Sequence, residues 1–384
     1  MLIRGVVSSP IRGVVGSPVL SGGFSLAAFM AQQSDGFWYD FTRSDTMFQE
    51  GVGPTPADEP NEVIGLALSQ RLWGGQTRAG YLAGQPELVT NGDFSAGSVA
   101  WGNVSTGTGT LTIGSGAATI VGTNGTNRGA LSQNLGMVIG RLYWLTFDAT
   151  IFGGTAYIGG SAVGSGGVVV AAGLNAVYFV AASESIIAYT ASSSGNVRLD
   201  SISVREVSQV PATQSTTSFK PKFQLVGATG DGTDDRAVTN YAAGSGENFL
   251  MLPATTVPVT LAGTQVLAGA MDGSANGAYI AITTAGALRV KWGATTLDST
   301  GVDLRNGVRD VGLWTDNGTL YLFADGVVVG SGAWTGTIPT TTWNLWALNN
   351  NGTASNFFAG SLKAALAGRE AINLARAIQI CANA

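Results

Sequence analysis

Glycine occupies 56 of the 384 positions in this chain, and many glycines separate short runs in which apolar and polar residues alternate. Glycine supplies the positive backbone angles of tight turns, and alternation with a period of two marks strands with one buried face. Asn-Gly and Asp-Gly pairs, as in TDNG (315–318) and ADG (324–326), are typical of hairpin turns. Helical spacing is confined to 368–380. The sequence therefore predicts an all-β fold with one short C-terminal helix.

Charge and residue usage exclude several function classes. The net charge is −5, so the chain has no basic surface for nucleic acid, and its apolar stretch at 14–30 is too interrupted to span a membrane or to form a signal peptide. Histidine is absent, which excludes Ser-His-Asp and Cys-His nucleophilic sites and every His-ligated metal site. A single cysteine, Cys381, cannot form an internal disulfide.

The length favours two or three domains, and the texture of the sequence changes at three points. Residues 1–36 begin with a tandem octad, IRGVVSSP (3–10) and IRGVVGSP (11–18). Residues 37–85 contain the aromatic run FWYDF and an acidic loop, 86–207 form a Gly/Thr/Ser-rich β segment, and 208–384 form a second β segment that ends in the helix. We expect an extended N-terminal arm followed by two β-sandwiches.

Alternation in RLYWLTFDATIF (141–152) predicts a long central strand of the third segment. One face carries Leu142, Trp144, Thr146 and Asp148, and the other carries Tyr143, Leu145, Phe147 and Ala149. Repeated strands of this kind, separated by turn residues, are typical of a sandwich.

Residues 86–207 resemble carbohydrate-binding modules of the family four/nine type. The resemblance rests on ELVTNGDFSAGSVAW (87–101), GRLYWLTFDA (140–149) and the closing strand RLDSISVREV (198–207). It implies a jelly-roll sandwich, and such modules either bind glycans or serve as spacers.

Residues 219–384 resemble concanavalin-A-like, laminin-G-type sandwiches through GDGTDDRAV (230–238), the hairpin text at 308–334 and FFAGSLKAAL (357–366). Residues 37–80, resumed at 209–235, resemble a module of bacteriophage and prophage tail or structural proteins in which a short acidic segment leads into a lectin-like sandwich. Because the two parts of this module are split, the block between them is interpreted as an inserted domain.

Three aromatic residues of the inserted block are the candidate carbohydrate-binding residues: Trp101, Tyr143 and Tyr157. Sugars stack on flat aromatic faces because their C–H edges are apolar. The alternative is that the aromatics, including Trp101 and Trp144, belong to the core. The resemblance also implies a Ca²⁺ site at Asp93 and Asp200, and the alternative there is two separately solvated carboxylates.

Three further carboxylates, Asp231, Asp234 and Asp235, lie within GDGTDD, where a cation could neutralise their repulsion. The pattern favours an Asp-Gly turn instead. None of the glutamates follows the Glu-x-Asp-x-x-Glu pattern of concanavalin-like glucanases, so the sequence predicts a protein that is not an enzyme.

The octads predict short strand-prone units that are closed by Ser-Pro, because proline lacks the N–H needed for ladder pairing. We expect them to dock on other virion proteins, the alternative being a free or domain-packed arm. The residues expected to anchor the chain are Ile3, Arg4, Val6, Val7, Ile11, Arg12, Val14 and Val15.

Together these features predict a bacteriophage virion surface protein, a fibre, tail or capsid decoration component, that attaches to bacterial surface glycans. The resemblance to fibres implies a homo-oligomer, with a trimer expected. The alternatives are a purely structural virion protein and, with less support, a glycan depolymerase.

Overall fold

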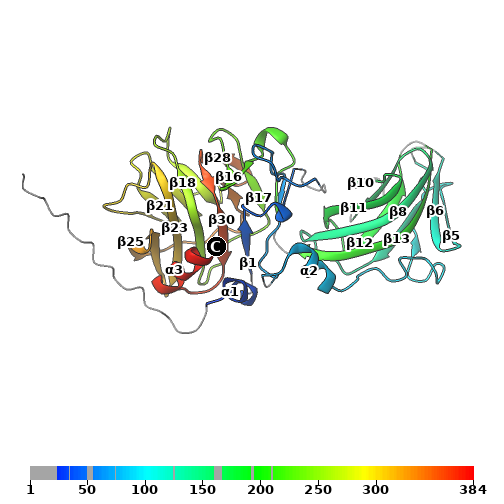
Figure 1. The fold of residues 1–384 in the computed structure, drawn as a ribbon, viewed down its shortest axis with the longest axis horizontal. Coiled ribbons are helices and arrows are strands. Elements are labelled where there is room, and N and C mark those ends of the chain that lie inside the picture. The colour runs from blue at the N-terminus through cyan, green and yellow to red at the C-terminus, as the bar shows by residue number, and fades with distance from the viewer. Residues whose placement is uncertain are drawn as a thin grey trace, which may run out of the picture.

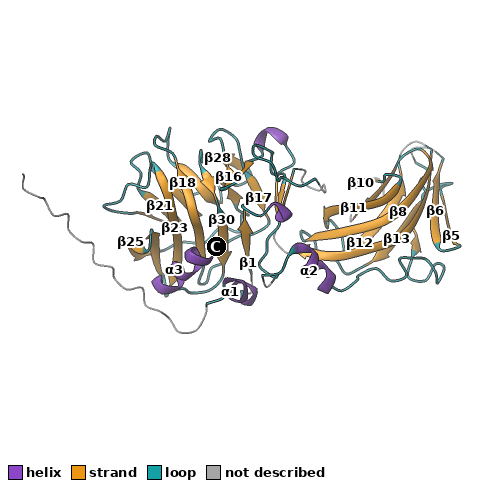
Figure 2. Cartoon of the chain, in the orientation of Figure 1, coloured by secondary structure: helices purple, strands orange, loops and turns teal. Residues whose placement is uncertain are grey.

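The structure is a computed structural model, and it describes residues 24–33, 35–49, 55–73, 75–123, 126–159, 167–191, 194–208 and 211–384. Strands dominate these residues, and four sheets form two sandwiches (Figure 2). The predicted all-β class, with one sandwich inserted ahead of the other and a short C-terminal helix, is confirmed.

Sheet A, with nine strands, is the first layer of the larger sandwich. Its main path is β15 (Lys222–Gln224), β16 (Gly227–Thr229), β29 (Ser361–Leu362), β18 (Phe249–Val257), β23 (Gly307–Asp316), β24 (Thr319–Ala324) and β25 (Val327–Ala333), and β18 also pairs with β30 (Ala364–Gly368), which pairs with β1 (Gly36–Asp40).

Sheet B, with eleven strands, is the second layer. Its order is β2 (Met47–Phe48), β3 (Leu66–Ala67), β14 (Ala212–Thr213), β17 (Ala237–Thr239), β26 (Asn344–Leu345), β19 (Gln265–Met271), β20 (Gly277–Ile282), β21 (Leu288–Gly293) and β22 (Thr295–Asp298). In addition, β27 (Leu348–Asn350) pairs with β19, and β28 (Thr353–Ser355) pairs with β27.

Two five-stranded sheets form the other sandwich, which lies to the right in Figure 1. Sheet C has the order β10 (Val168–Val169), β9 (Ala156–Gly159), β12 (Ser185–Thr190), β7 (Ala130–Asn134) and β4 (Gly102–Asn103). Sheet D has the order β11 (Gly173–Val180), β8 (Leu142–Gly153), β13 (Gly195–Ser208), β6 (Ala117–Gly122) and β5 (Thr110–Gly114).

Two strand pairs show that the smaller sandwich is an insertion. β1 pairs antiparallel with β30 near the end of the chain, and β3 pairs with β14. All strands of sheets C and D come between β3 and β14 in the sequence. The chain therefore leaves sheet B, builds the second sandwich, and returns to the neighbouring strand. The residue boundaries predicted from texture stay predictions.

Each sandwich has its own apolar core. One lies between sheets A and B and includes Leu250, Leu313 and Ile280, and the other lies between sheets C and D and includes Leu145, Phe147 and Ile158. The alternation predicted for 142–149 is confirmed, because Tyr143, Leu145, Phe147 and Ala149 are buried in the second core.

Three helices are described: α1 (Leu26–Gln32), α2 (Arg78–Gly84) and α3 (Leu374–Asn383). Short 3₁₀ turns occur at Ser44–Thr46 and Thr217–Phe219. α1 and α3 pack on the outer face of sheet A, where Met30 and Ile380 join Trp314 and Phe323 in a third apolar cluster. The predicted closing helix is thus present, and it covers one face of the larger sandwich.

α2 lies at the joint between the sandwiches. The guanidinium carbon of Arg78 lies 5.3 Å from the ring centroid of Phe48 and 5.9 Å from the rings of both Trp144 and Tyr178. Arg78 also donates a 2.7 Å hydrogen bond to the Tyr178 hydroxyl. Phe48 belongs to sheet B, whereas Trp144 and Tyr178 belong to sheet D. A cation held by aromatic rings from both sandwiches therefore fixes the joint.

The aromatic cluster around β1 lets us predict how a substitution there changes the free energy of unfolding. Phe37 is fully buried, and its ring centroid lies 4.8 Å from that of Tyr39, 5.3 Å from Tyr241 and 6.4 Å from Trp343. Replacing Phe37 with Ala leaves a cavity, so we expect Phe37→Ala to lower the free energy of unfolding by about 3–5 kcal/mol in urea titrations.

The matched control is Val99→Ala, because Val99 is 58% exposed and its truncation should change stability by less than about 0.5 kcal/mol. Equal stability of the Phe37 and Val99 variants would contradict a sandwich that depends on its first strand.

Candidate functional site

The anchoring residues predicted in the octads, Ile3, Arg4, Val6, Val7, Ile11, Arg12, Val14 and Val15, lie outside the described residues. Their role stays a prediction.

Trp101 and Tyr143 are core residues, and the prediction that their rings bind sugar is wrong for this structure. Trp101 is 6% exposed, packs on Phe94 at 5.2 Å, and donates its indole N–H to the Asn91 carbonyl at 2.9 Å. Tyr143 is 1% exposed, and burial raises the pKa of its hydroxyl. A ring enclosed in this way cannot present a face to a ligand. The alternation of 142–149 already placed Tyr143 on one face with Leu145 and Phe147, and that face is buried.

Tyr157 is the predicted aromatic that stays partly exposed. It lies on the outer face of sheet C, because its neighbours on β9, Ala156 and Ile158, point into the core. Tyr157 pairs across the sheet with Tyr189 of β12, and the two ring centroids are 5.6 Å apart at an interplanar angle of 32°. Its partner on the other side is Val169 of β10, which is 56% exposed. Tyr157, Val169 and Tyr189 therefore form an aromatic and aliphatic strip on sheet C, in which Tyr157 and Val169 are accessible, whereas Tyr189 is only 2% exposed.

The surroundings of this strip combine a cation with small residues. Arg128 places its guanidinium carbon 5.5 Å from the Tyr189 ring centroid. The adjacent outward positions are Gly159, Ile187 and Ser132, and the first of these has no side chain to cover the ring of Tyr157. A partly exposed aromatic ring such as that of Tyr157 is a surface on which the apolar face of a sugar can stack. Sequence reasoning missed Tyr189 and Arg128, although the alternation of SIIAYT (185–190) places Tyr189 on the same face as Ile187.

The Ca²⁺ site that the resemblance implies at Asp93 and Asp200 stays a prediction. The Asp93 carboxylate accepts hydrogen bonds from the backbone and hydroxyl of Ser95 at 3.2 and 2.9 Å, and these bonds lower its pKa. The Asp200 carboxylate accepts the corresponding pair from Ser201 at 2.7 and 3.3 Å. Among the described residues, the group of three acidic side chains close enough to share a metal ion lies elsewhere and includes neither of them.

That group is Asp231, Asp234 and Asp235, whose carboxylate oxygens lie within 4.8 Å of one another. Asp231 accepts hydrogen bonds from the backbone N–H groups of Thr233 at 2.7 Å and Asp234 at 3.3 Å. Its own N–H donates to the Asp235 carboxylate at 2.9 Å. These oxygens are of the type that Ca²⁺ takes, but the hydrogen bonds are those of the expected Asp-Gly turn.

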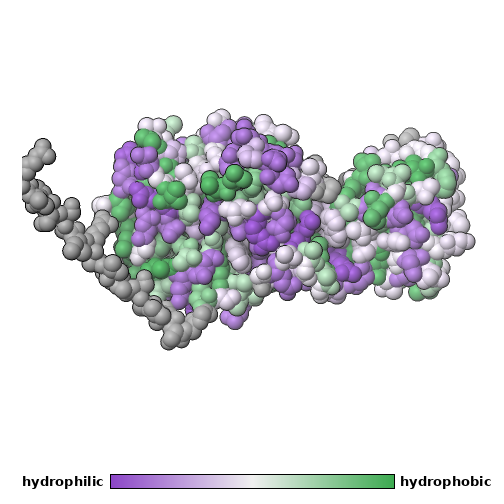
Figure 3. Space-filling view, in the orientation of Figure 1, coloured by the Kyte–Doolittle hydropathy of each residue, from purple (hydrophilic) through white to green (hydrophobic). Residues whose placement is uncertain are grey.

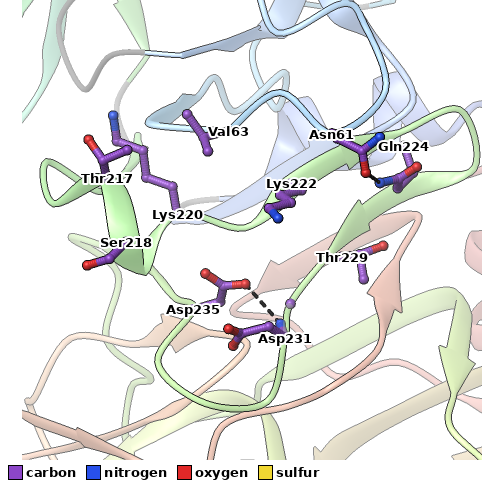
Figure 4. A pocket seen from close by; sticks show the side chains of 11 residues that line it. Asn61, Val63, Thr217, Ser218, Lys220, Lys222, Gln224, Thr229, Asp231 and Asp235 are labelled. Atoms are coloured by element: carbon purple, nitrogen blue, oxygen red, sulfur yellow. Dashed lines mark hydrogen bonds between the residues drawn. The ribbon is translucent and has the colours of Figure 1, made fainter.

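Asp231 and Asp235 also line a cleft of about 450 Å³ (Figure 4). The cleft carries both signs of charge, since Lys220 and Lys222 line it from the other side. Lys220 is 7% exposed and donates to the Gln49 carbonyl at 2.7 Å. The remaining lining residues are Asn61, Val63, Thr217, Ser218, Gln224, Thr229 and Gly230.

Burial raises the pKa of Asp235 to about 6, the hydrogen bond from Asp231 opposes this shift, and the nearby carboxylates of Asp231 and Asp234 add to it. Because the folded-state pKa lies above the unfolded value, the folded state binds the proton more tightly. The resulting stability is present below about pH 4 and is lost as the pH rises through about 6.

We therefore expect Asp235→Asn to remove this dependence. Between pH 4 and pH 7, the free energy of unfolding of the wild type should fall relative to that of the variant by up to about 2 kcal/mol, measured by urea titration. The exposed Asp58→Asn is the control and should follow the wild type. Parallel curves for the wild type and Asp235→Asn would contradict the raised pKa.

None of the described helices has the length and apolar character that crossing a membrane requires.

Comparison with known proteins finds matches among solved structures alone, since no family model and no curated protein matches the chain. The CBM40 domain of a Ruminococcus gnavus IT-sialidase, solved with α2,3-sialyllactose, is similar over 35% of this chain and 82% of its own length, with 18% identity and a TM-score of 0.30. The Trypanosoma rangeli sialidase in complex with the inhibitor DANA is similar over 46% of this chain and 30% of its own, with 16% identity and a TM-score of 0.35. A leech intramolecular trans-sialidase is similar over 35% of this chain and 23% of its own, with 17% identity and a TM-score of 0.29.

At these identities and TM-scores the similarity assigns no function to this chain. This chain spans less than a third of the two enzymes' lengths. The prediction that the chain is not an enzyme is corrected by these neighbours, because they include a sialidase and a trans-sialidase. The structures named here include no bacteriophage protein.

Proposed function

We propose that this chain is a surface protein of a bacteriophage particle that attaches to bacterial surface glycans through the outer face of sheet C. The observation that carries the glycan part is the partly exposed ring of Tyr157, which lies between Val169 and Tyr189 on that face. The virion part rests on the resemblance of residues 37–80 and 209–235 to phage structural modules.

The chemistry of the face suits a neutral or weakly charged sugar. The C–H edge of a pyranose packs on the Tyr157 ring and on Val169, while Arg128 and Ser132 offer hydrogen-bond donors near its hydroxyl groups. A single site of this size binds weakly. Several copies on one particle would convert weak binding into avidity, which agrees with the expected homo-oligomer.

In this proposal the N-terminal arm docks on other virion proteins, and the sandwiches project from the outer, extracellular surface of the virion. Main-chain pairing of the octads with a partner's sheet edge would supply affinity, and Arg4 and Arg12 would pair with acidic groups there. The proposed division assigns 1–36 to anchoring, 86–207 to glycan contact, and 37–85 with 208–384 to the larger sandwich.

The glycan part is tested with fluorescently labelled full-length protein on a panel of host cells, intact or stripped of surface polysaccharide. We expect binding to intact cells, loss of binding on stripping, and a loss of about tenfold or more in affinity for Tyr157→Ala, because the stacking surface is removed. Tyr157→Phe keeps the ring and should retain most of the binding.

The folded state of each variant is checked by its urea midpoint. Unchanged binding by folded Tyr157→Ala would remove this face from the proposal. Absence of binding by folded wild-type protein to any host would favour the purely structural virion protein.

The anchoring part predicts that deletion of residues 3–18 abolishes incorporation into particles and leaves the urea midpoint unchanged, because the deletion removes none of the core residues that the structure describes. Incorporation is measured by immunoblotting of purified virions, with the Val99→Ala variant as the control. Normal incorporation of the deleted chain would overturn the docking role.

A further inference from the structure

The two outer faces of the larger sandwich differ in what covers them. The outer face of sheet A is covered by α1 and α3, whereas α2 lies at the joint. The outer face of sheet B carries a small apolar cluster of its own, formed by Val266, Ala281 and Leu348 with the partly buried Tyr279 and Met271. On the face drawn in Figure 3, polar and apolar residues are interspersed over the larger sandwich. The cluster on sheet B places the aromatic ring of Tyr279 on a strand in the interior of the sheet.

Two glycines of sheet B, Gly269 and Gly277, lie next to Tyr279. It pairs with Gly269 of β19, and a Cβ atom added to Gly269 would lie 2.4 Å from the Cβ of Tyr279. Gly277, the preceding outward position on β20, leaves space that the aliphatic stem of Lys291 occupies, since an added Cβ there would lie 3.0 Å from Lys291 Cδ. The ring of Tyr279 remains partly exposed.

The charges around Tyr279 are unevenly balanced. Arg289 of β21 forms a bidentate pair with Asp298 of β22, with both N···O distances at 2.7 Å. Lys291 lies directly opposite Tyr279 across the sheet, and in the described structure its ammonium group donates to two neutral oxygens, those of Ala294 at 3.3 Å and Thr296 at 3.4 Å. Both contacts are long and neither acceptor is charged, so the ammonium group can also pair with an anion.

We propose that Tyr279 and Lys291 form a second sugar-binding surface, specific for a pyranose that carries a carboxylate. The sugar ring stacks on Tyr279, and its carboxylate pairs with the Lys291 ammonium. The Arg289–Asp298 pair borders the surface and supplies donors and acceptors to hydroxyl groups. This inference deepens the proposed glycan attachment and rests on it: the inserted sandwich and the larger sandwich would each contact the same surface polysaccharide.

The test measures direct binding of free sugars to the full chain by saturation-transfer NMR titration. The probes are glucuronate, galacturonate and N-acetylneuraminate, with glucose and galactose as neutral counterparts. We expect at least one acidic sugar to bind several-fold more tightly than the neutral sugars, a loss of about tenfold in Tyr279→Ala, and near-wild-type binding in Tyr279→Phe. Lys291→Gln should abolish the preference for the acidic sugar and retain the residual binding of the neutral ones.

Tyr321→Ala is the matched control, because Tyr321 is a partly buried strand tyrosine that stacks on Trp314 at 5.1 Å on the covered face of sheet A. It should leave acidic-sugar binding unchanged. Equal affinity for acidic and neutral sugars, or unchanged binding by folded Tyr279→Ala, would overturn the inference.

The two surfaces are separated by comparing Tyr157→Ala with Tyr279→Ala. If Tyr157→Ala loses cell attachment while Tyr279→Ala binds acidic sugars as the wild type does, the proposed function stands and the second surface is refuted. If Tyr279→Ala loses acidic-sugar binding while Tyr157→Ala attaches to cells as the wild type does, the face on sheet C is refuted and the second surface stands.

Discussion

The larger sandwich depends on backbone pairing between the two ends of its sequence. β1 pairs residue for residue with β30, from Gly36 opposite Gly368 to Asp40 opposite Ala364. The close approach leaves no room for a side chain at Gly36, where an added Cβ would lie 2.1 Å from the Ala367 carbonyl oxygen. Pairing over so long a sequence separation carries an entropic cost that only a large buried core can offset. The aromatic cluster seeded by Phe37 supplies part of that core.

The joint between the sandwiches extends this constraint to the inserted domain. Arg78 lies against rings from both sandwiches, the Trp73 indole donates to the Val207 carbonyl at 3.3 Å, and Asn240 donates to the Gly140 carbonyl at 2.7 Å. Polar contacts at three places, combined with a shared apolar cluster, restrain rotation of one sandwich against the other. The two proposed sugar surfaces would then be held at a constant separation, which would raise their joint affinity without any new contact.

The sequence predicted the class of the fold, the insertion and the closing helix, because these depend on period-two alternation, turn residues and the split phage-like module. It predicted the faces of 142–149 for the same reason. It could not decide which aromatics are exposed, because alternation separates two faces of a strand without showing what covers each face. Trp101 is buried by Phe94, which lies in a loop, whereas Tyr279 stays partly exposed beside Gly269 and Gly277. Both outcomes depend on packing between separate segments of the chain.

The inserted sandwich begins and ends on neighbouring strands. β3 and β14 pair through Leu66 opposite Thr213 and Ala67 opposite Ala212, so the chain leaves and re-enters sheet B at one place. A genetic exchange that replaced the segment between these strands would leave the strand pairs of sheets A and B unaltered, provided that the new ends lay equally close together and that Ser69 and Gln70, which hydrogen-bond to Trp38 of β1, were kept. This architecture permits one inserted sandwich to be replaced by another in a single recombination event, while the larger sandwich continues to fold as before.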